Sequence, residues 1–253
     1  MKTIVHLVIT VMLLTAIGCA SVPSRDEKIA EAIANPTRTE AHRERDARSK
    51  PEIVLGLLDL KPGQNAADIF GGGGYYAELM AVMVGPTGSV ILHNNTPYSK
   101  FVEKQNKARY IDNTVPGITL LKSEVDDLKL TPDSLDAVLM VMSYHDLYFF
   151  APERGWNETD VPLFVRQVHE ALKPGGKLLI VDHAAAVGSG NTAPQDIHRI
   201  DEEYAKQDIT SQGFRLVATS DALRNPDDDR TKMVFDKSIR GQTDRFVLLF
   251  EKE

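Results

Sequence analysis

The stretch DIFGGGGYYAE, residues 68–78, decides how the rest of this 253-residue chain is interpreted. A short apolar run, residues 65–70, leads into four consecutive glycines, and residues 75–84 then have the composition of a helix. A glycine-rich turn between a strand and a helix allows a tight bend and lets a ligand approach backbone N–H groups at the start of the helix. The stretch therefore predicts a ligand-binding loop; the alternative is a flexible turn that binds no ligand.

Working outward from this loop, apolar runs alternate with segments of helical spacing. The predicted strands are residues 65–70, 88–94, 117–123, 135–143, 177–183, 214–220 and 244–252. The predicted helices are residues 51–60, 75–84, 99–111, 161–172 and 194–212. Strands that alternate with helices indicate an α/β fold, in which a largely parallel sheet is covered by helices on both faces.

Composition and charge narrow the class of partner. Apolar residues make up 42% and charged residues 26% of the chain, which are ordinary values for a globular protein. The formal net charge of −7 argues against a nucleic-acid partner, because such proteins usually carry a basic surface. The one short basic cluster, at Arg43, Arg45 and Arg48, is interleaved with acids, and we interpret it as a solvated helix face.

The first residues have the pattern of an export signal. Lys2 is followed by an apolar run, residues 4–18, which is short for a membrane span and ends at Cys19, the only cysteine. This resembles a bacterial lipoprotein signal, in which the cysteine is lipidated and becomes the new N-terminus. We therefore expect a signal peptide at 1–18, a polar, partly helical extension at 19–50 and the main domain at 51–253. The expected location is the exported face of a membrane, either periplasmic or at the cell exterior, with lipidated Cys19 as the attachment; an uncleaved anchor, or an ordinary signal with an incidental cysteine, is the alternative.

Several motifs, taken in order, resemble the class I S-adenosylmethionine-dependent methyltransferases. Asp68, Gly72 and Gly74 match the acid and two glycines of the family's first motif, and residues 172–182 (LKPGGKLLIVD) match its helix–turn–strand segment. The segments YHD, DHAAAVGSG, HRID and TDRFVLLFEK are similar to a little-characterised bacterial subgroup of predicted methyltransferases. The resemblance covers about residues 50–253. It implies a three-layer, Rossmann-like methyltransferase fold whose seven strands run in the order 3-2-1-4-5-7-6, with only the seventh antiparallel.

The same resemblance implies a site for S-adenosylmethionine. The cofactor-binding candidates are Asp68, Gly71, Gly72, Gly73, Gly74, Asn94, Glu124 and Val125. Two positions depart from the family pattern. Phe70 stands where the first glycine is expected, so that Gly71 is the residue expected to take over the turn. Asn94 stands where the family usually has an acid for the ribose hydroxyls, which implies weaker hydrogen bonds to the ribose.

Histidines and aspartates follow two of the buried strands. His145 and Asp146 come after residues 135–143, His183 ends residues 177–183, and His198 lies a little further on. Side chains at the carboxyl ends of neighbouring parallel strands converge on one crevice, so these four are the candidate catalytic residues. A histidine oriented by a carboxylate can exchange protons near neutral pH. Two histidines and a carboxylate could also hold a metal, although no closely spaced zinc pattern is present, and no metal is assigned.

These observations favour methyl transfer from S-adenosylmethionine to a small molecule. Such catalysis depends largely on holding donor and acceptor in line. Export is the difficulty, because S-adenosylmethionine is not expected to be made outside the cell. Two alternatives therefore remain open: a non-catalytic ligand-binding or accessory lipoprotein on the same fold, and a different reaction carried out by the histidines. Aromatic residues are expected to wall a substrate pocket or to pack in the core: Tyr144, Tyr148, Phe149, Phe150 and Trp156.

Overall fold

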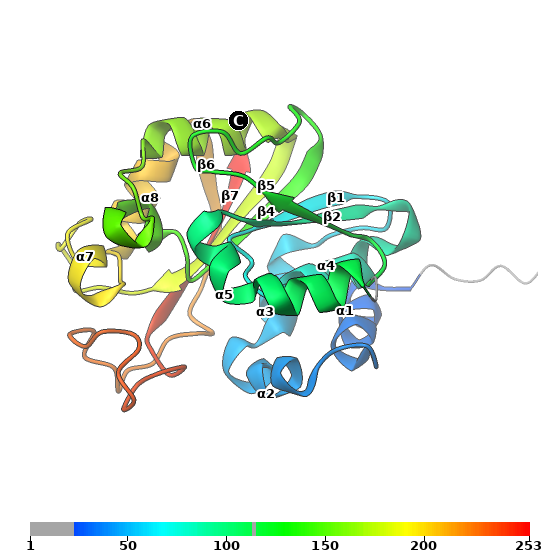
Figure 1. Ribbon diagram of the computed structural model, residues 1–253, viewed down its shortest axis with the longest axis horizontal. Helices are drawn as coiled ribbons and strands as arrows, with labels where there is room; N and C mark the ends of the chain where they lie inside the picture. The colour runs from blue at the N-terminus through cyan, green and yellow to red at the C-terminus, as the bar shows by residue number, and fades with distance from the viewer. Residues whose placement is uncertain (1–22, 113–114) are drawn as a thin grey trace, which may run out of the picture.

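A seven-stranded sheet forms the centre of the computed structural model, which describes residues 23–112 and 115–253 (Figure 1). Its strands are β1 (Asn65–Ile69), β2 (Ser89–Asn94), β3 (Ile118–Lys122), β4 (Leu135–Val141), β5 (Leu172–His183), β6 (Phe214–Ser220) and β7 (Arg245–Lys252). The spatial order is β3-β2-β1-β4-β5-β7-β6. All neighbours pair in parallel except β7, which is antiparallel to both β5 and β6. The predicted order and the single antiparallel strand are confirmed.

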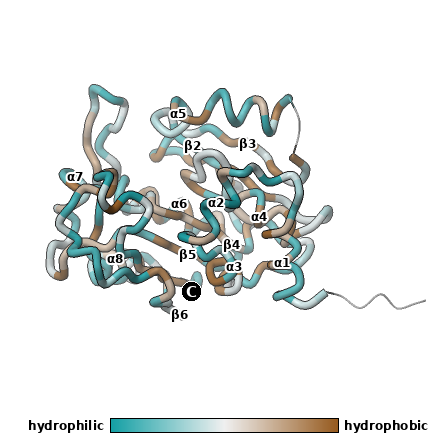
Figure 2. The backbone as a smooth tube through the Cα atoms, turned by 90° about the horizontal axis from the view of Figure 1, so that it is seen from below, coloured by the Kyte–Doolittle hydropathy of each residue, from teal (hydrophilic) through white to brown (hydrophobic). Residues whose placement is uncertain are grey.

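Helices cover both faces of this sheet. The α-helices are α1 (Arg25–Ala34), α2 (Glu40–Ser49), α3 (Pro51–Leu58), α4 (Tyr75–Val84), α5 (Thr96–Asn106), α6 (Val161–Ala171), α7 (Pro194–Ile197) and α8 (Glu202–Thr210). Apolar side chains of α1, α3 and α4 build one core, and those of α6 and α8 build the other. Figure 2 shows hydrophobic colour along the central strands and more hydrophilic colour over the outer helices and loops.

The buried strands explain why the sheet needs two covering layers. In β4, Ala137 and Leu139 belong to the core beneath α4, while Val138 and Met140 belong to the core beneath α6. Successive side chains of a strand point to opposite faces, so a continuous apolar run must be covered on both. Burial of this kind is the main source of stability for such a domain, at about 25 cal/mol for each Å² of apolar surface removed from water.

The single helix predicted over residues 194–212 is wrong, because the chain leaves the helical path after α7. His198 adopts a left-handed conformation with φ +54°, and Ile200 then pairs in parallel with Ala184 at the end of β5. Asp201 restarts the helix by accepting a hydrogen bond from the backbone N–H of Glu203. Pairing with the strand end therefore outweighs the helical periodicity, and it brings His198 to the edge of the sheet where β5 ends.

The N-terminal extension folds back onto the main domain. Helix α2 lies beside the glycine loop, and Arg45 stacks over the Tyr75 ring with its guanidinium carbon 4.2 Å from the ring centroid. The interpretation of the basic cluster as a solvated helix face is therefore wrong for Arg45. The expected signal peptide and Cys19 fall within residues 1–22, outside the described part of the chain. Among the described residues, none of the helices combines the length and the apolar character needed to cross a membrane.

Candidate active site

A cavity of about 1010 Å³ lies at the carboxyl ends of β1, β4 and β5. Its walls come from the glycine loop, helix α2, the short 3-10 helix His145–Tyr148 and the segment 234–245. The cavity is large enough for a cofactor and a small second molecule, since ligand pockets commonly measure about 300–1,000 Å³. It brings together Asp68, Gly71, Gly72, Gly73, His145, Asp146, His183 and His198 from the sequence-predicted site.

Phe70 takes up the turn at the end of β1. Its φ is +54°, whereas Gly71 is not among the residues with positive φ, so the expectation that Gly71 takes over the turn is wrong. A non-glycine residue in this conformation is strained and needs compensation from its surroundings. The Phe70 ring is buried and stacks on Tyr98 and Phe164, with centroid separations of 5.1 and 5.8 Å. Aromatic packing therefore offsets the backbone strain.

The four glycines have different reasons to be glycine. A Cβ on Gly71 would stand 2.5 Å from the Asp68 carboxyl, and one on Gly73 would stand 2.5 Å from Gln105. A Cβ on Gly74 would collide with the Tyr110 hydroxyl. Only Gly72, with φ +59°, has no atom within 4 Å of the place where its Cβ would be, and it lines the cavity. Three glycines thus make room for the protein's own side chains, and Gly72 leaves room for a ligand.

Asn94 closes the loop from the side of β2. Its Oδ1 accepts a hydrogen bond from the backbone N–H of Gly72 at 2.9 Å, and its Nδ2 donates to the Gly72 carbonyl at 3.0 Å. Asn106 donates to the same carbonyl at 3.0 Å. Asn94 therefore shapes the loop with both ends of its amide, and it is not among the residues that line the cavity.

The remaining cofactor candidates are divided between the cavity and its surroundings. Asp68 is buried in the wall, where it accepts a hydrogen bond from the backbone N–H of Ala77 at 3.1 Å, and burial raises its pKa to about 7. Glu124, which follows β3, lies beside the start of α5, and its Oε1 accepts hydrogen bonds from the backbone N–H and the hydroxyl of Thr96. Val125 packs against the core beneath α6. Glu124 and Val125 do not line the cavity.

His145 is held between two carboxylates. Its Nδ1 lies 2.7 Å from Asp182 Oδ1, its backbone N–H donates to Asp182 Oδ2 at 2.8 Å, and its Nε2 lies 3.3 Å from Asp146 Oδ1. Burial by itself would lower the pKa of His145, but the two negative charges outweigh burial and raise the pKa to about 10. Near neutral pH the ring is therefore an imidazolium with both nitrogens engaged, which suits it to fix its neighbours rather than to accept a proton.

His183 has the opposite character. Its Nδ1 lies 2.7 Å from the Thr243 hydroxyl, and its ring centroid is 5.8 Å from that of His145. Burial lowers the pKa of His183 well below its ordinary value, and the positive charges of His145 and Arg245 add to the effect. Two neighbouring histidines whose pKa values are driven apart are a pattern found where acid–base roles are divided.

His198 and Asp146 complete the group. His198 Nδ1 lies 3.3 Å from Asp146 Oδ1, and the Tyr98 hydroxyl donates to Asp146 Oδ2 at 2.6 Å. Ligand atoms of His145, Asp146 and His198 all lie within 4.8 Å of one another, so the trio has the composition of a metal site. The same distances are those of ordinary ion pairs, and we treat the trio as a hydrogen-bonded group.

Sequence reasoning missed the arginines and the threonine of this cavity. These residues are Arg45, Arg48, Arg154, Arg240, Thr243 and Arg245. The signal for Arg45 and Arg48 was present as a basic pattern on a helix, but only the tertiary structure brings that helix to the cavity. Thr243 and Arg245 stand in the TDRFVLLFEK segment, which was used only as a family resemblance.

Comparison with known sequences finds a methyltransferase domain and two methyltransferase relatives. Residues 68–180 match the family model described as a methyltransferase domain. A ubiquinone/menaquinone biosynthesis C-methyltransferase, UbiE, from Saccharophagus degradans is 22% identical over an alignment of 203 residues, which covers 76% of this chain and 73% of that protein. UbiE from Ectopseudomonas mendocina is 27% identical over 131 residues, 51% of this chain and 46% of that protein. This second match thus spans about half the length of each protein.

Solved structures agree in fold. An S-adenosylmethionine-dependent methyltransferase from Aquifex aeolicus superimposes with a TM-score of 0.60 and 18% identity, over 91% of this chain and 100% of that one. The [4+2]-cyclase SpnF superimposes with a TM-score of 0.57 and 16% identity, over 87% of this chain and 84% of that one. The fold alone therefore does not fix the reaction.

Together, the strand order and the match of residues 68–180 show a methyltransferase domain on the fold of the class I S-adenosylmethionine-dependent methyltransferases. The cofactor of this domain is S-adenosylmethionine. The residues present fit this cofactor, because Gly72 borders the cavity and leaves open the space that a side chain would fill. Asp68, Gly72 and Gly73 are the residues that would hold it.

Proposed function

We propose that the protein methylates a carbon atom of a small molecule and that His183 removes the proton which that carbon must lose. The observation that carries the proposal is that the glycine loop and His183 line the same cavity. The relatives named as C-methyltransferases support carbon, rather than oxygen or nitrogen, as the acceptor.

The cofactor supplies an electrophilic methyl group, and the chain's own residues have to manage the acceptor and its proton. When a carbon with one hydrogen gains a methyl group in an unsaturated ring, the C–H bond breaks and its electron pair returns to the ring. A neutral imidazole nitrogen can take that proton. His183 Nε2 makes no hydrogen bond to any described residue, and its ring lines the cavity.

Neighbouring residues keep His183 in this state. The Thr243 hydroxyl lies beside Nδ1 and fixes the ring orientation, which leaves Nε2 toward the reactants. The positively charged His145 ring keeps His183 neutral by repulsion, and Asp182 and Asp146 hold His145 in place. Phe149 and Trp156, which also line the cavity, reduce the access of water to the acceptor.

The test combines cofactor binding with methyl transfer. Calorimetry should detect binding of S-adenosylhomocysteine, and a panel of hydroxylated aromatic compounds should be assayed for the release of S-adenosylhomocysteine from S-adenosylmethionine. His183→Gln should lower kcat by roughly 10²–10⁴-fold, the usual contribution of a general base, with little change in cofactor affinity. His169→Gln, on α6 and outside the cavity, is the matched control and should keep its activity.

Three results would count against the proposal. A wild-type protein that binds neither cofactor form would remove methyl transfer altogether. Cofactor binding without transfer to any compound would favour the alternative of a non-catalytic ligand-binding protein. Full activity in His183→Gln would leave methyl transfer in place and remove His183 as the base.

A further inference from the structure

Three arginines from distant parts of the chain share one wall of the cavity. Arg45 and Arg48 come from α2, and Arg245 begins β7. Arg245 donates a hydrogen bond to the backbone carbonyl of Arg48, which fixes the two segments together. Arg48 is exposed, Arg45 is half-buried against aromatic rings, and Arg245 is buried. We call these three residues the arginine cluster.

Among the described residues, no ion pair joins the arginine cluster to an acid. Asp46, beside Arg45 in sequence, is bound instead by both terminal nitrogens of Arg38, at 2.7 and 2.8 Å. Asp244, beside Arg245, is bound instead by Arg230 at 2.9 Å. The nearest acids in sequence are thus paired with other arginines, and the carboxylates of Asp68 and Asp244 act on the cluster through their charge without forming an ion pair with it.

Arg245 is the buried member of the arginine cluster. Its side chain is 7% exposed, and its Nε is buried without a hydrogen-bond partner. Burial lowers the pKa of Arg245, and this lowering, together with repulsion from Arg45 and Arg48, outweighs the opposite effect of Tyr76 and Asp244. A buried charge without an ion-pair partner is unfavourable, and Arg245 is also among the residues that line the cavity, so an anionic group bound there would offset part of this unfavourable energy.

We propose that the arginine cluster binds a carboxylate or phosphate group carried by the methyl acceptor. Guanidinium groups suit this task because their fixed donors match the oxygens of both anions. The cluster adjoins the proposed base, because Thr243 contacts His183 and stands two residues before Arg245. An anionic group bound there would anchor the acceptor beside His183. This inference rests on the proposed function, and the carboxylate of S-adenosylmethionine is the other possible source of the anion.

Inorganic phosphate is the first probe, because it presents the anion alone. Titration calorimetry should detect phosphate binding to the wild-type protein, and phosphate should raise its melting temperature. Arg48→Gln should weaken phosphate binding roughly tenfold or more, which corresponds to the loss of one charge-assisted hydrogen bond. Because Arg48 is exposed, this variant should melt like the wild type without phosphate. Arg166→Gln, an exposed change on α6, is the matched control and should bind phosphate normally.

The second arm separates the two sources of the anion. S-adenosylhomocysteine carries the amino-acid carboxylate, and 5′-methylthioadenosine lacks it. If the cluster serves the acceptor, Arg48→Gln should change the affinity for both compounds less than threefold. A variant that loses affinity for S-adenosylhomocysteine alone would overturn the assignment to the acceptor.

Two further outcomes separate failure of the anion subsite from failure of the proposed function. Equal phosphate affinity in Arg48→Gln and the wild type would overturn the anion subsite itself. If the wild-type protein binds phosphate through Arg48 but ignores both cofactor analogues, the proposed function fails while the anion subsite stands. Failure of one proposal is therefore distinguishable from failure of the other.

Discussion

At the scale of single residues, the glycine loop depends on side chains that surround it. Asp68, Gln105 and Tyr110 occupy the space that Cβ atoms on Gly71, Gly73 and Gly74 would need. Asn94 spans the loop by bonding to Gly72 at both its N–H and its carbonyl. The loop is therefore a packed structure with one open position, Gly72, and its shape is fixed before any ligand arrives.

Asn94→Asp should destabilise the protein by about 1–3 kcal/mol, the cost of leaving a buried polar group without its partner. The new carboxylate cannot donate to the Gly72 carbonyl and instead presents an oxygen to it. Urea unfolding of the variant and of Asn191→Asp, an exposed control, would measure this difference. A variant as stable as the wild type, with tighter binding of S-adenosylmethionine, would instead favour the ribose role that the family resemblance implies for this position.

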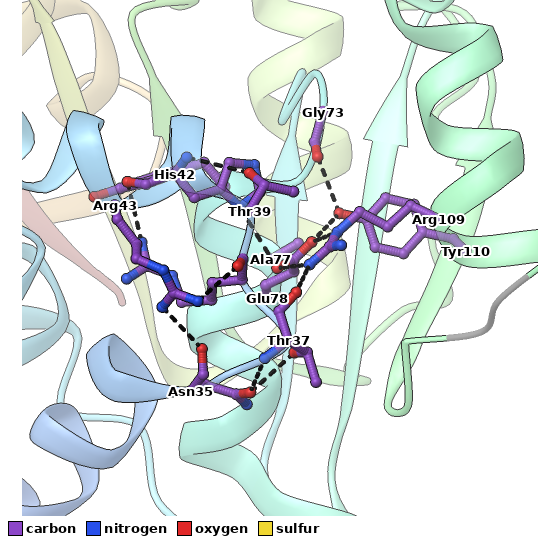
Figure 3. A network of polar contacts seen from close by, with 12 residues as sticks. Asn35, Thr37, Thr39, His42, Arg43, Gly73, Ala77, Glu78, Arg109 and Tyr110 are labelled. Atoms are coloured by element: carbon purple, nitrogen blue, oxygen red, sulfur yellow. Dashed lines mark hydrogen bonds and ion pairs between the residues drawn. The ribbon is translucent and has the colours of Figure 1, made fainter.

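At the scale of elements, Glu78 on α4 attaches the N-terminal extension to the domain. It is 4% exposed, and Arg109 donates to its Oε2 at 2.6 Å while the Tyr110 hydroxyl lies 2.8 Å from its Oε1 (Figure 3). His42 of α2 lies 3.5 Å from the same carboxylate, and Arg109 also donates to the carbonyl of Thr37. These contacts hold α2, and with it Arg45 and Arg48, against the glycine loop.

Glu78→Gln should lower the free energy of unfolding by about 3 kcal/mol, because it removes one partner of a buried ion pair. Burial would raise the pKa of Glu78, but hydrogen bonds from Arg109, His42 and Tyr110 outweigh it and lower the pKa from 4.5 to about 2. A depressed pKa stabilises the fold above the unfolded value, and this contribution is lost as the pH falls from about 4.5 toward 2. The stability difference between wild type and variant should therefore shrink over that range.

Denaturant unfolding at pH 7, 4 and 3 provides the measurement. Glu103→Gln, an exposed change on α5, should have little effect at any of these values. A stability difference between wild type and Glu78→Gln that does not vary with pH would contradict the assigned role of the Glu78 carboxylate.

At the scale of the whole molecule, charge is distributed unevenly. The chain carries a net charge of −7, yet its cavity is lined by Arg45, Arg48, Arg154, Arg240 and Arg245. A local concentration of positive charge in an acidic protein attracts an anionic ligand to one place and leaves the rest of the surface unattractive to it. The cavity is therefore suited to a small anionic ligand.

Lipidation of Cys19 is the prediction at this scale, and it rests on the sequence of the first residues. In a cell fractionation experiment the wild-type protein should sediment with membranes, and Cys19→Ala should appear in the soluble fraction or keep its signal peptide. Mass spectrometry of the mature N-terminus would identify the lipid. Identical processing and identical membrane association of the two proteins would contradict lipidation.

The sequence by itself determined the alternation of strands and helices, the glycine loop and the two strand ends that carry His145 and His183. These features depend on neighbours in the chain, where periodicity and turn residues act locally. The order of the strands came from the resemblance of several motifs taken together. The helix predicted over residues 194–212 failed because pairing of Ile200 with Ala184 is a contact between distant segments, and local periodicity carries no information about it.

Only the tertiary structure decided which side chains face the cavity. Arg48 and Arg245 are 197 residues apart, and they meet because α2 folds back over the glycine loop. Asn94 turns toward the loop because Gly72 offers both a donor and an acceptor there. The opposite pKa shifts of His145 and His183 likewise require burial and charges from other elements. Residue types and spacing indicate what chemistry a chain can perform, whereas burial and long-range contacts determine which residues are placed to perform it.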